Sequence, residues 1–138
     1  MPRKLLAGLL LLAPALFLAA DARAATLTVT VMSRAGQDVT ALAASADAAK
    51  TDKWLNTGAE FFVIVNGSGS PTTATLNLGV GGIVDGQTPS ARTVTVLAGH
   101  TAVMGPFPTN FYNDSNGYAS ITYSAVTTVT VLVVRPGS

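Results

Sequence analysis

Apolar residues and threonines alternate strictly just after the first 25 residues of the chain. From Thr26 to Val31 every second residue is leucine or valine, and every residue between them is threonine. A period of two is the signature of a strand that buries one face and leaves the other in water. We therefore expect one half-buried strand over Thr26–Val31.

Similar segments recur along the chain, separated by turns rich in Gly, Pro and Asn. The continuous apolar run within Glu60–Val65 is typical of a central strand, and Asn113–Gly117 is the strongest hairpin turn signal. Asp38–Lys53 is rich in alanine and predicts either a short helix or an irregular connection. The expected strands are Thr26–Val31, Glu60–Val65, Thr72–Leu78, Arg92–Leu97, Thr101–Met104, Tyr118–Tyr123 and Val126–Val134.

Seven or eight short strands at this spacing predict an all-β fold. We expect residues 25–138 to form a single antiparallel β-sandwich of immunoglobulin-like or jelly-roll type. The chain contains no cysteine, so its stability must come from packing and main-chain hydrogen bonds rather than from disulfides.

The first 24 residues have the pattern of an export signal. Arg3 and Lys4 precede an apolar stretch from Leu5 to Ala20, and Ala22-Arg23-Ala24 has the small-x-small form of a cleavage site. The stretch is shorter than the roughly 20 residues that cross a bilayer. We therefore expect residues 1–24 to be a cleaved signal peptide and the product to be secreted or held at the cell surface; if the segment is retained, the protein is membrane-anchored.

Charge is scarce after the predicted cleavage site, where five basic and six acidic residues are spread singly. No basic stripe follows the chain, which argues against nucleic acid as a partner. The same part of the chain contains 18 threonines and 9 serines. Such a surface is typical of strands that face water or pack against copies of themselves.

No arrangement of residues in the sequence indicates a reaction. His100 is the single histidine and stands beside Gly99 in a predicted turn, without the clustered partners that a metal or general-base site needs. Asp114–Gly117 resembles part of a calcium loop, but tyrosines occupy the first and twelfth ligand positions. We expect no catalytic residue, no cofactor and no metal, and therefore not an enzyme.

Aromatic residues allow two interpretations. Trp54, Phe111 and Tyr112 could face a ligand in a carbohydrate-binding-like module. Packing at the ends of the sandwich is the interpretation that we favour, since large aromatics in small domains usually supply buried area.

An ordered series of segments resembles small β-sandwich proteins encoded by tailed bacteriophages. The resemblance covers roughly Asn56 to Arg135. Its segments are Asn56-Thr57-Gly58-x-Glu60-Phe61-Phe62-x-x-x-Asn66, Arg92-Thr93-Val94-Thr95-Val96-x-Ala98-Gly99, Gly105-Pro106-Phe107-Pro108, Tyr112-Asn113-Asp114 with Gly117, and Thr122-Tyr123-Ser124-x-Val126-Thr127. The resemblance implies a virion structural or head-decoration protein without enzymatic activity. An export signal departs from that pattern, because phage capsids assemble in the host cytoplasm.

The function expected from the sequence is therefore a non-enzymatic, exported structural or assembly domain, with decoration of a virion or cell surface as its most specific form. The alternative is an extracellular ligand-binding module. Partners would be copies of the chain or another surface or capsid protein. The candidate assembly strands are Thr26–Val31 and Val126–Val134, because neither carries the Lys, Pro or bulge that usually protects a sheet edge. Their outward residues are Thr26, Thr28, Thr30, Thr128 and Thr130.

Overall fold

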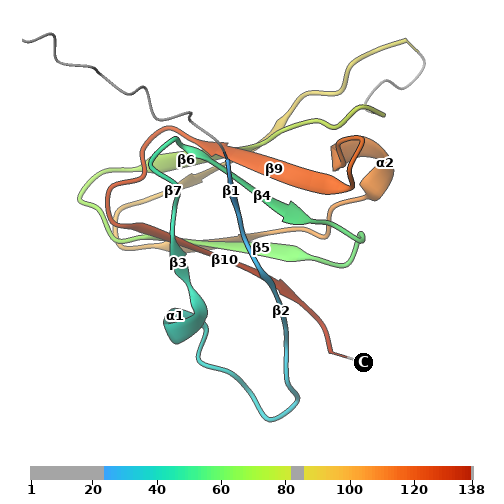
Figure 1. Cartoon of the computed structure of the whole chain (residues 1–138). Coiled ribbons are helices and arrows are strands. Elements are labelled where there is room, and N and C mark those ends of the chain that lie inside the picture. Colours follow the sequence, from blue (N-terminus) through green and yellow to red (C-terminus); the bar gives the residue numbers. More distant parts are fainter. Residues whose placement is uncertain (1–23, 82–85, 138) are drawn as a thin grey trace, which may run out of the picture.

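The computed structural model describes residues 24–81 and 86–137, which form an all-β protein with two one-turn helices (Figure 1). The predicted signal peptide lies outside the described residues, apart from Ala24. The elements are β1 (Ala25–Thr26), β2 (Val29–Val31), α1 (Val39–Leu42), β3 (Ala44–Ser45), β4 (Thr51–Leu55), β5 (Phe61–Asn66), β6 (Thr72–Leu76), β7 (Arg92–Val96), β8 (Thr101–Met104), α2 (Thr109–Tyr112), β9 (Tyr118–Tyr123) and β10 (Val129–Arg135).

The strands form two mixed sheets that enclose one core (Figure 1). Sheet A has the order β1-β4-β9-β6-β7, and sheet B has the order β2-β10-β5-β8 with β3 also paired to β10. Only β1 with β4 and β2 with β10 run parallel; the remaining pairs are antiparallel. The expected all-β class is confirmed, while the sheets are mixed rather than purely antiparallel.

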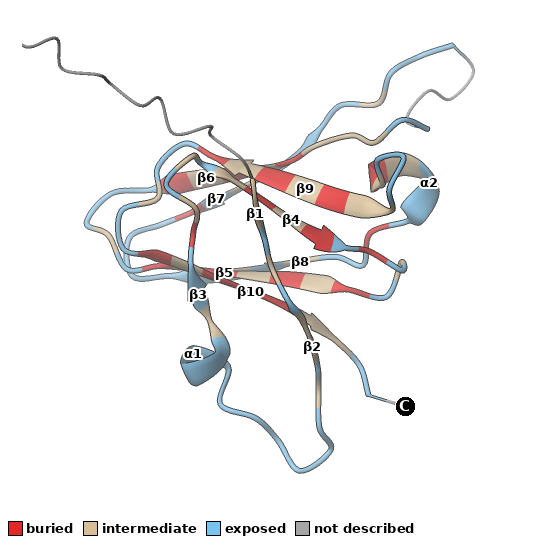
Figure 2. Cartoon of the chain, viewed as in Figure 1, coloured by how far each residue is buried: buried red, intermediate tan, exposed pale blue. Residues whose placement is uncertain are grey.

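The core follows the pleat of the strands, and Figure 2 shows buried and less buried residues alternating along them. In β5, Phe62, Ile64 and Asn66 are buried, and the residues between them are only half-buried. The sequence of β5 is apolar on both faces, so its periodicity is visible only in the structure. Trp54 of sheet A stacks on Phe62 of sheet B with ring centroids 5.3 Å apart. This contact joins the two sheets at the centre of the core.

The predicted strand Thr26–Val31 is wrong as a single element, because the chain changes sheets within it. β1 pairs with β4 of sheet A, and β2 pairs with β10 of sheet B. The amide of Leu27 donates to the carbonyl of Lys53, and the amide of Met32 donates to the carbonyl of Arg135. The alternation predicted extended backbone correctly, but it carries no information on which sheet each end joins.

Two further boundaries differ from the prediction. Asp38–Lys53 contains α1, β3 and the start of β4, with the Asp38 carboxylate capping α1 by accepting from the amides of Thr40 and Ala41. The last strand begins at Val129 rather than Val126. Val126–Val129 is instead a turn, closed by a hydrogen bond from the amide of Val129 to the carbonyl of Val126, and Thr128 has a positive φ of 53°.

Candidate functional site

The predicted assembly strand at the N-terminal end lies at the margin of both sheets. β1 and β2 are each the last strand of their sheet, and within the described residues no strand pairs with their outer edges. Thr26 and Thr28 are exposed, and Thr30 is half-buried. This segment therefore keeps unpaired main-chain groups along one side of the molecule, and its role in assembly stays a prediction.

The second predicted assembly strand is not an edge. β10 pairs with β5 on one side and with β2 and β3 on the other. Thr130 lies opposite Ser45 and Val65, and Thr128 precedes the strand in an exposed turn. The expectation that Thr128 and Thr130 stand on a free edge is corrected: a long β-branched strand is as typical of an interior position as of an edge.

The outer face of sheet B is apolar and uncharged. Its outward residues on β5, β8 and β10 form rows across the strands, such as the row of Val103, Val63 and Leu132. Val103 is 61% exposed, whereas Leu132 is only 5% exposed. We call this surface the valine face; it consists of Phe61, Val63, Val65, Val103, Leu132 and Val134.

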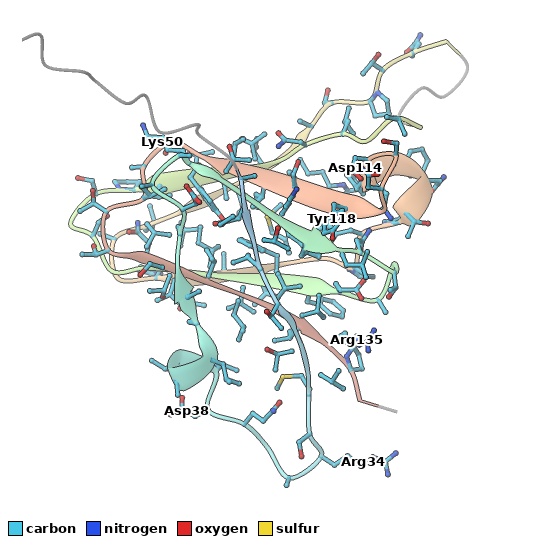
Figure 3. All side chains as sticks on the ribbon, in the orientation of Figure 1. Arg34, Asp38, Lys50, Asp114, Tyr118 and Arg135 are labelled. Atoms are coloured by element: carbon cyan, nitrogen blue, oxygen red, sulfur yellow. The ribbon has the colours of Figure 1, made fainter. Side chains whose placement is uncertain are left out.

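Leu132 is buried because the segment with α1 and β3 crosses over it. Two grooves of about 370 Å³ and 170 Å³ lie beside this segment; Leu42 and Ala44 line the first, and Val39 and Ala43 line the second. Val39 and Leu42 are themselves 42% exposed. Among the labelled side chains of Figure 3, Arg34 and Asp38 belong to the connection between β2 and α1 and lie away from the strands of the two sheets. The segment covers part of the valine face and adds apolar surface of its own.

The outer face of sheet A has the opposite character. Thr51, Thr122, Thr75 and Thr93 lie in one row across four strands. In the next row the hydroxyls of Thr73 and Thr95 are 3.2 Å apart, within hydrogen-bonding distance. We call this surface the threonine face; it consists of Thr51, Thr73, Thr75, Thr93, Thr95, Ser120 and Thr122.

A cleft of about 490 Å³ opens where the edge strands β7 and β8 diverge. Its walls are apolar and aromatic, and Arg92 is the single charged residue in the lining. The Nε of Arg92 donates to the Tyr112 hydroxyl over 2.8 Å. The lining residues are Arg92, Thr93, Val94, Met104, Gly105, Pro106, Phe107, Pro108, Phe111 and Tyr112.

The wall formed by residues 105–113 is fixed from two sides. Asn56 donates from Nδ2 to the carbonyl of Phe107 and to Oδ1 of Asn113, and Asn113 donates back to the carbonyl of Asn56. Behind α2, the amide of Gly79 donates to the carbonyl of Phe111. A Cβ on Gly79 would overlap the carbonyl of Asn113, so only glycine allows this approach.

The base of the same wall rests on the Glu60–Phe61 backbone. Gly105 has a φ of 126°, and a Cβ there would lie 2.7 Å from the carbonyl oxygen of Glu60. The side chain of Glu60 is fully buried, and its carboxylate accepts from the amides of Thr57, Gly58 and Ala59 and from the Thr57 hydroxyl. Burial alone would raise the pKa of Glu60, but these hydrogen bonds outweigh it and lower the pKa.

Only one of the three predicted ligand-facing aromatics remains accessible. Trp54 is 0% exposed in the core, because β4 directs it between the sheets, so its ligand-facing role is corrected. Tyr112 and Phe111 both line the cleft, where Tyr112 is buried and Phe111 is half-buried. The sequence indicated these two residues as ligand-facing aromatics. It did not indicate Arg92 and Met104 as cleft residues, which come from β7 and β8.

Two carboxyl groups of the described residues, those of Glu60 and Asp52, are fully buried. No group of three or more potential metal ligands occurs within residues 24–81 and 86–137. Asp52 is buried beside Tyr123, whose hydroxyl donates to Oδ2 over 2.8 Å. Burial raises the pKa of Asp52, with the nearby charge of Asp47 adding to the rise. Its Oδ1 has no hydrogen-bond partner among the described residues.

Comparison with known proteins gives no relative from which a function could be transferred. No family model matches the chain, and neither a curated protein nor a solved structure matches it. In the described part of the chain, no helix has the length and apolarity required to cross a membrane.

Proposed function

We propose that this protein is a non-enzymatic, exported structural domain that assembles with copies of itself through the valine face. Decoration of a virion or cell surface is the most specific form of this function. The observation that carries the proposal is the exposure of Val103 on an uncharged sheet face and of Val39 and Leu42 on the α1 segment beside it. Exposed apolar surface of this kind is typical of interaction sites.

The absence of charge on the valine face favours a second copy as the partner. In a two-fold symmetric contact the residues near the axis face their own copies, so a charge at that point would oppose a like charge. The outward residues of β5, β8 and β10 avoid this repulsion because they are valine, leucine, phenylalanine and threonine. One edge of β2 pairs with β10, and its other edge is free. This free edge can extend the same contact through main-chain hydrogen bonds.

The segments that resemble phage proteins support a structural role. Asn56, Glu60, Gly105, Phe107 and Asn113 belong to three of those segments and meet in one hydrogen-bonded corner. These residues hold loops in place. Successive strands from β4 onward pass repeatedly between sheets A and B, which supports a sandwich of the proposed immunoglobulin-like or jelly-roll type.

Light scattering over a range of concentrations tests the proposal. We expect the chain without residues 1–24 to be oligomeric and Val103→Lys to be monomeric. The matched control is Thr93→Lys, which places the same charge on an exposed position of the other edge strand and should leave the mass unchanged. A wild-type monomer at every concentration, or equal masses for both lysine variants, would contradict assembly through the valine face.

The free N-terminal edge is tested separately with Thr28→Lys. Thr28 is exposed between β1 and β2, so the added charge protects the edge without entering the core. If β2 contributes to the contact, this variant should weaken association less than Val103→Lys. An unchanged mass would restrict the interface to the valine face.

A second candidate function, extracellular ligand binding, is favoured by the cleft between β7 and β8. A carbohydrate-binding site would need exposed aromatic rings, but Trp54 and Tyr112 are buried and Phe111 is half-buried. Titration calorimetry with soluble oligosaccharides should therefore show no binding, and saturable heat that Phe111→Ala abolishes would restore the carbohydrate interpretation.

A further inference from the structure

We infer that the cleft between β7 and β8 binds the carboxyl-terminal end of an extended peptide, with the terminal carboxylate on Arg92 and the last side chain against Phe111. This inference rests on the second candidate function and gives it a specific ligand class. Its supporting features are the position of Arg92, the rigidity of the aromatic wall and the free edge of β7.

Arg92 is placed to bind an anion inside an apolar cleft. It shares one face of β7 with Val94 and the buried Val96, and it lines the cleft while remaining exposed to solvent. The bond from its Nε to Tyr112 fixes the guanidinium plane. Among residues 24–81 and 86–137, no acceptor is bonded to its two terminal nitrogens. A carboxylate can pair with these donors, and none of the described residues that line the cleft is acidic.

The wall opposite Arg92 is held in place by hydrogen bonds and close packing. Asn56 and Asn113 lock it from one side, and Gly79 allows close packing from the other. The rings of Phe107 and Tyr112 meet edge to face, with centroids 6.1 Å apart. A preorganised apolar wall lowers the entropy lost on binding, and it accepts a planar or branched apolar side chain.

The free edge of β7 supplies the direction of the peptide. β7 pairs only with β6 among the described strands, so alternate residues turn their N–H and C=O groups outward. An added antiparallel strand would run from Val96 toward Arg92 and would end beside the guanidinium. Its last side chain would then enter the cleft. Arg92 would therefore bind the terminal carboxylate, the apolar wall the last side chain, and the strand edge the main chain of the same peptide.

Fluorescence anisotropy with labelled peptides tests the inference. The probes are N-terminally labelled Thr-Val-Thr-Val-X peptides, where X is Phe, Leu, Val or Ala, each as a free acid and as an amide. We expect at least one acid to bind about 10-fold or more tightly than its amide. Arg92→Gln should abolish this preference, whereas the matched control Arg135→Gln, which removes an arginine outside the cleft lining, should retain it.

Hydrogen exchange and the binding of 3-phenylpropionate distinguish a failure of the peptide inference from a failure of ligand binding at this cleft. Binding to the β7 edge should slow the exchange of some amides of residues 93–95, which a ligand confined to the cleft would not do. If 3-phenylpropionate binds in an Arg92-dependent way and no peptide protects these amides, the cleft is a carboxylate site and the peptide inference is wrong. If neither the peptides nor 3-phenylpropionate bind at about 2 mM, ligand binding at this cleft is overturned as well.

Discussion

Both sheets alternate buried and outward residues along their strands, but the outward residues of the two sheets differ in polarity. Sheet A presents rows of threonines, and the hydroxyls of one pair, Thr73 and Thr95, lie within hydrogen-bonding distance of each other. Sheet B presents valines and leucine, and the chain covers only part of them with α1 and β3. The threonine face exposes polar hydroxyls to water, whereas the valine face and the α1 segment leave apolar side chains exposed. This difference is why we propose assembly through sheet B rather than sheet A.

The largest expected effect comes from the covered part of the valine face. Leu132→Ala should lower the free energy of unfolding by about 3 kcal/mol, because Leu132 is 5% exposed beneath the α1 segment and its loss leaves a cavity. Thr122→Ala, at the equivalent outward position on the interior strand β9, should cost less than about 1 kcal/mol. Urea denaturation of both variants measures the difference. Equal losses would mean that the two faces contribute alike to stability.

The next effect concerns the corner that joins the sheets. Glu60→Gln should lower the free energy of unfolding at pH 7 by about 2 kcal/mol, because the charged acceptor of four hydrogen bonds is lost. The folded-state pKa of Glu60 is lowered, so its stabilisation is present above the unfolded pKa and disappears as the pH falls through the folded value. The gap between wild type and variant should therefore close below about pH 4. Thr57→Val removes only the hydroxyl bond and serves as the milder control.

The opposite sign is expected from Asp52, so the two carboxyl groups can be separated by pH. Burial raises the pKa of Asp52, and its contribution to stability is present below the unfolded pKa and is lost as the pH rises through the folded pKa. The free energy of unfolding of Asp52→Asn should therefore rise relative to that of wild type as the pH increases from about 4 to 7. A constant difference at every pH would contradict the raised pKa.

A smaller effect is expected where α1 covers the valine face. Asp38→Ala removes the cap that bonds the amides of Thr40 and Ala41, which typically costs about 1 kcal/mol of helix stability. Because α1 is one turn at the surface, the loss should appear as faster amide exchange in residues 40–43 and as stronger binding of an apolar dye. Asp38→Asn keeps a capping oxygen and should behave as wild type. Unchanged dye binding by Asp38→Ala would show that α1 does not control access to the face.

The sequence predicted those parts of the fold in which one face alone is apolar or a strong turn sets the boundary. Tyr118–Tyr123 and Thr101–Met104 have the bounds of β9 and β8. β4 was missed because Asp52 occupies an inward position beside Trp54, which breaks the expected pattern of polar and apolar residues. The strand change at Leu27 was missed because both of its halves alternate in the same way.

The cleft could be predicted only in fragments. The sequence indicated Phe111 and Tyr112 as aromatics that could face a ligand. Arg92 and Gly105 appeared only as members of the segments that resemble phage proteins. Their meeting depends on the divergence of β7 from β8 and on the close packing allowed by Gly79, neither of which has a signal in residue spacing. Tertiary pairing, rather than local propensity, therefore places the candidate site.

The smallest expected effect tests whether one apolar residue is enough to change the character of the threonine face. Thr75 lies in the centre of its row, between Thr122 and Thr93, and its carbonyl accepts from the Thr122 hydroxyl. Thr75→Val keeps the β-branched shape and this carbonyl, so the free energy of unfolding should change by less than about 0.5 kcal/mol. Its neighbours remain threonines, so the new apolar surface stays far below the size of an interaction patch, and the mass in light scattering should not change. Association of this variant at concentrations where wild type shows none would mean that threonines suppress contact on sheet A one residue at a time, and the contrast with the valine face would then be one of degree.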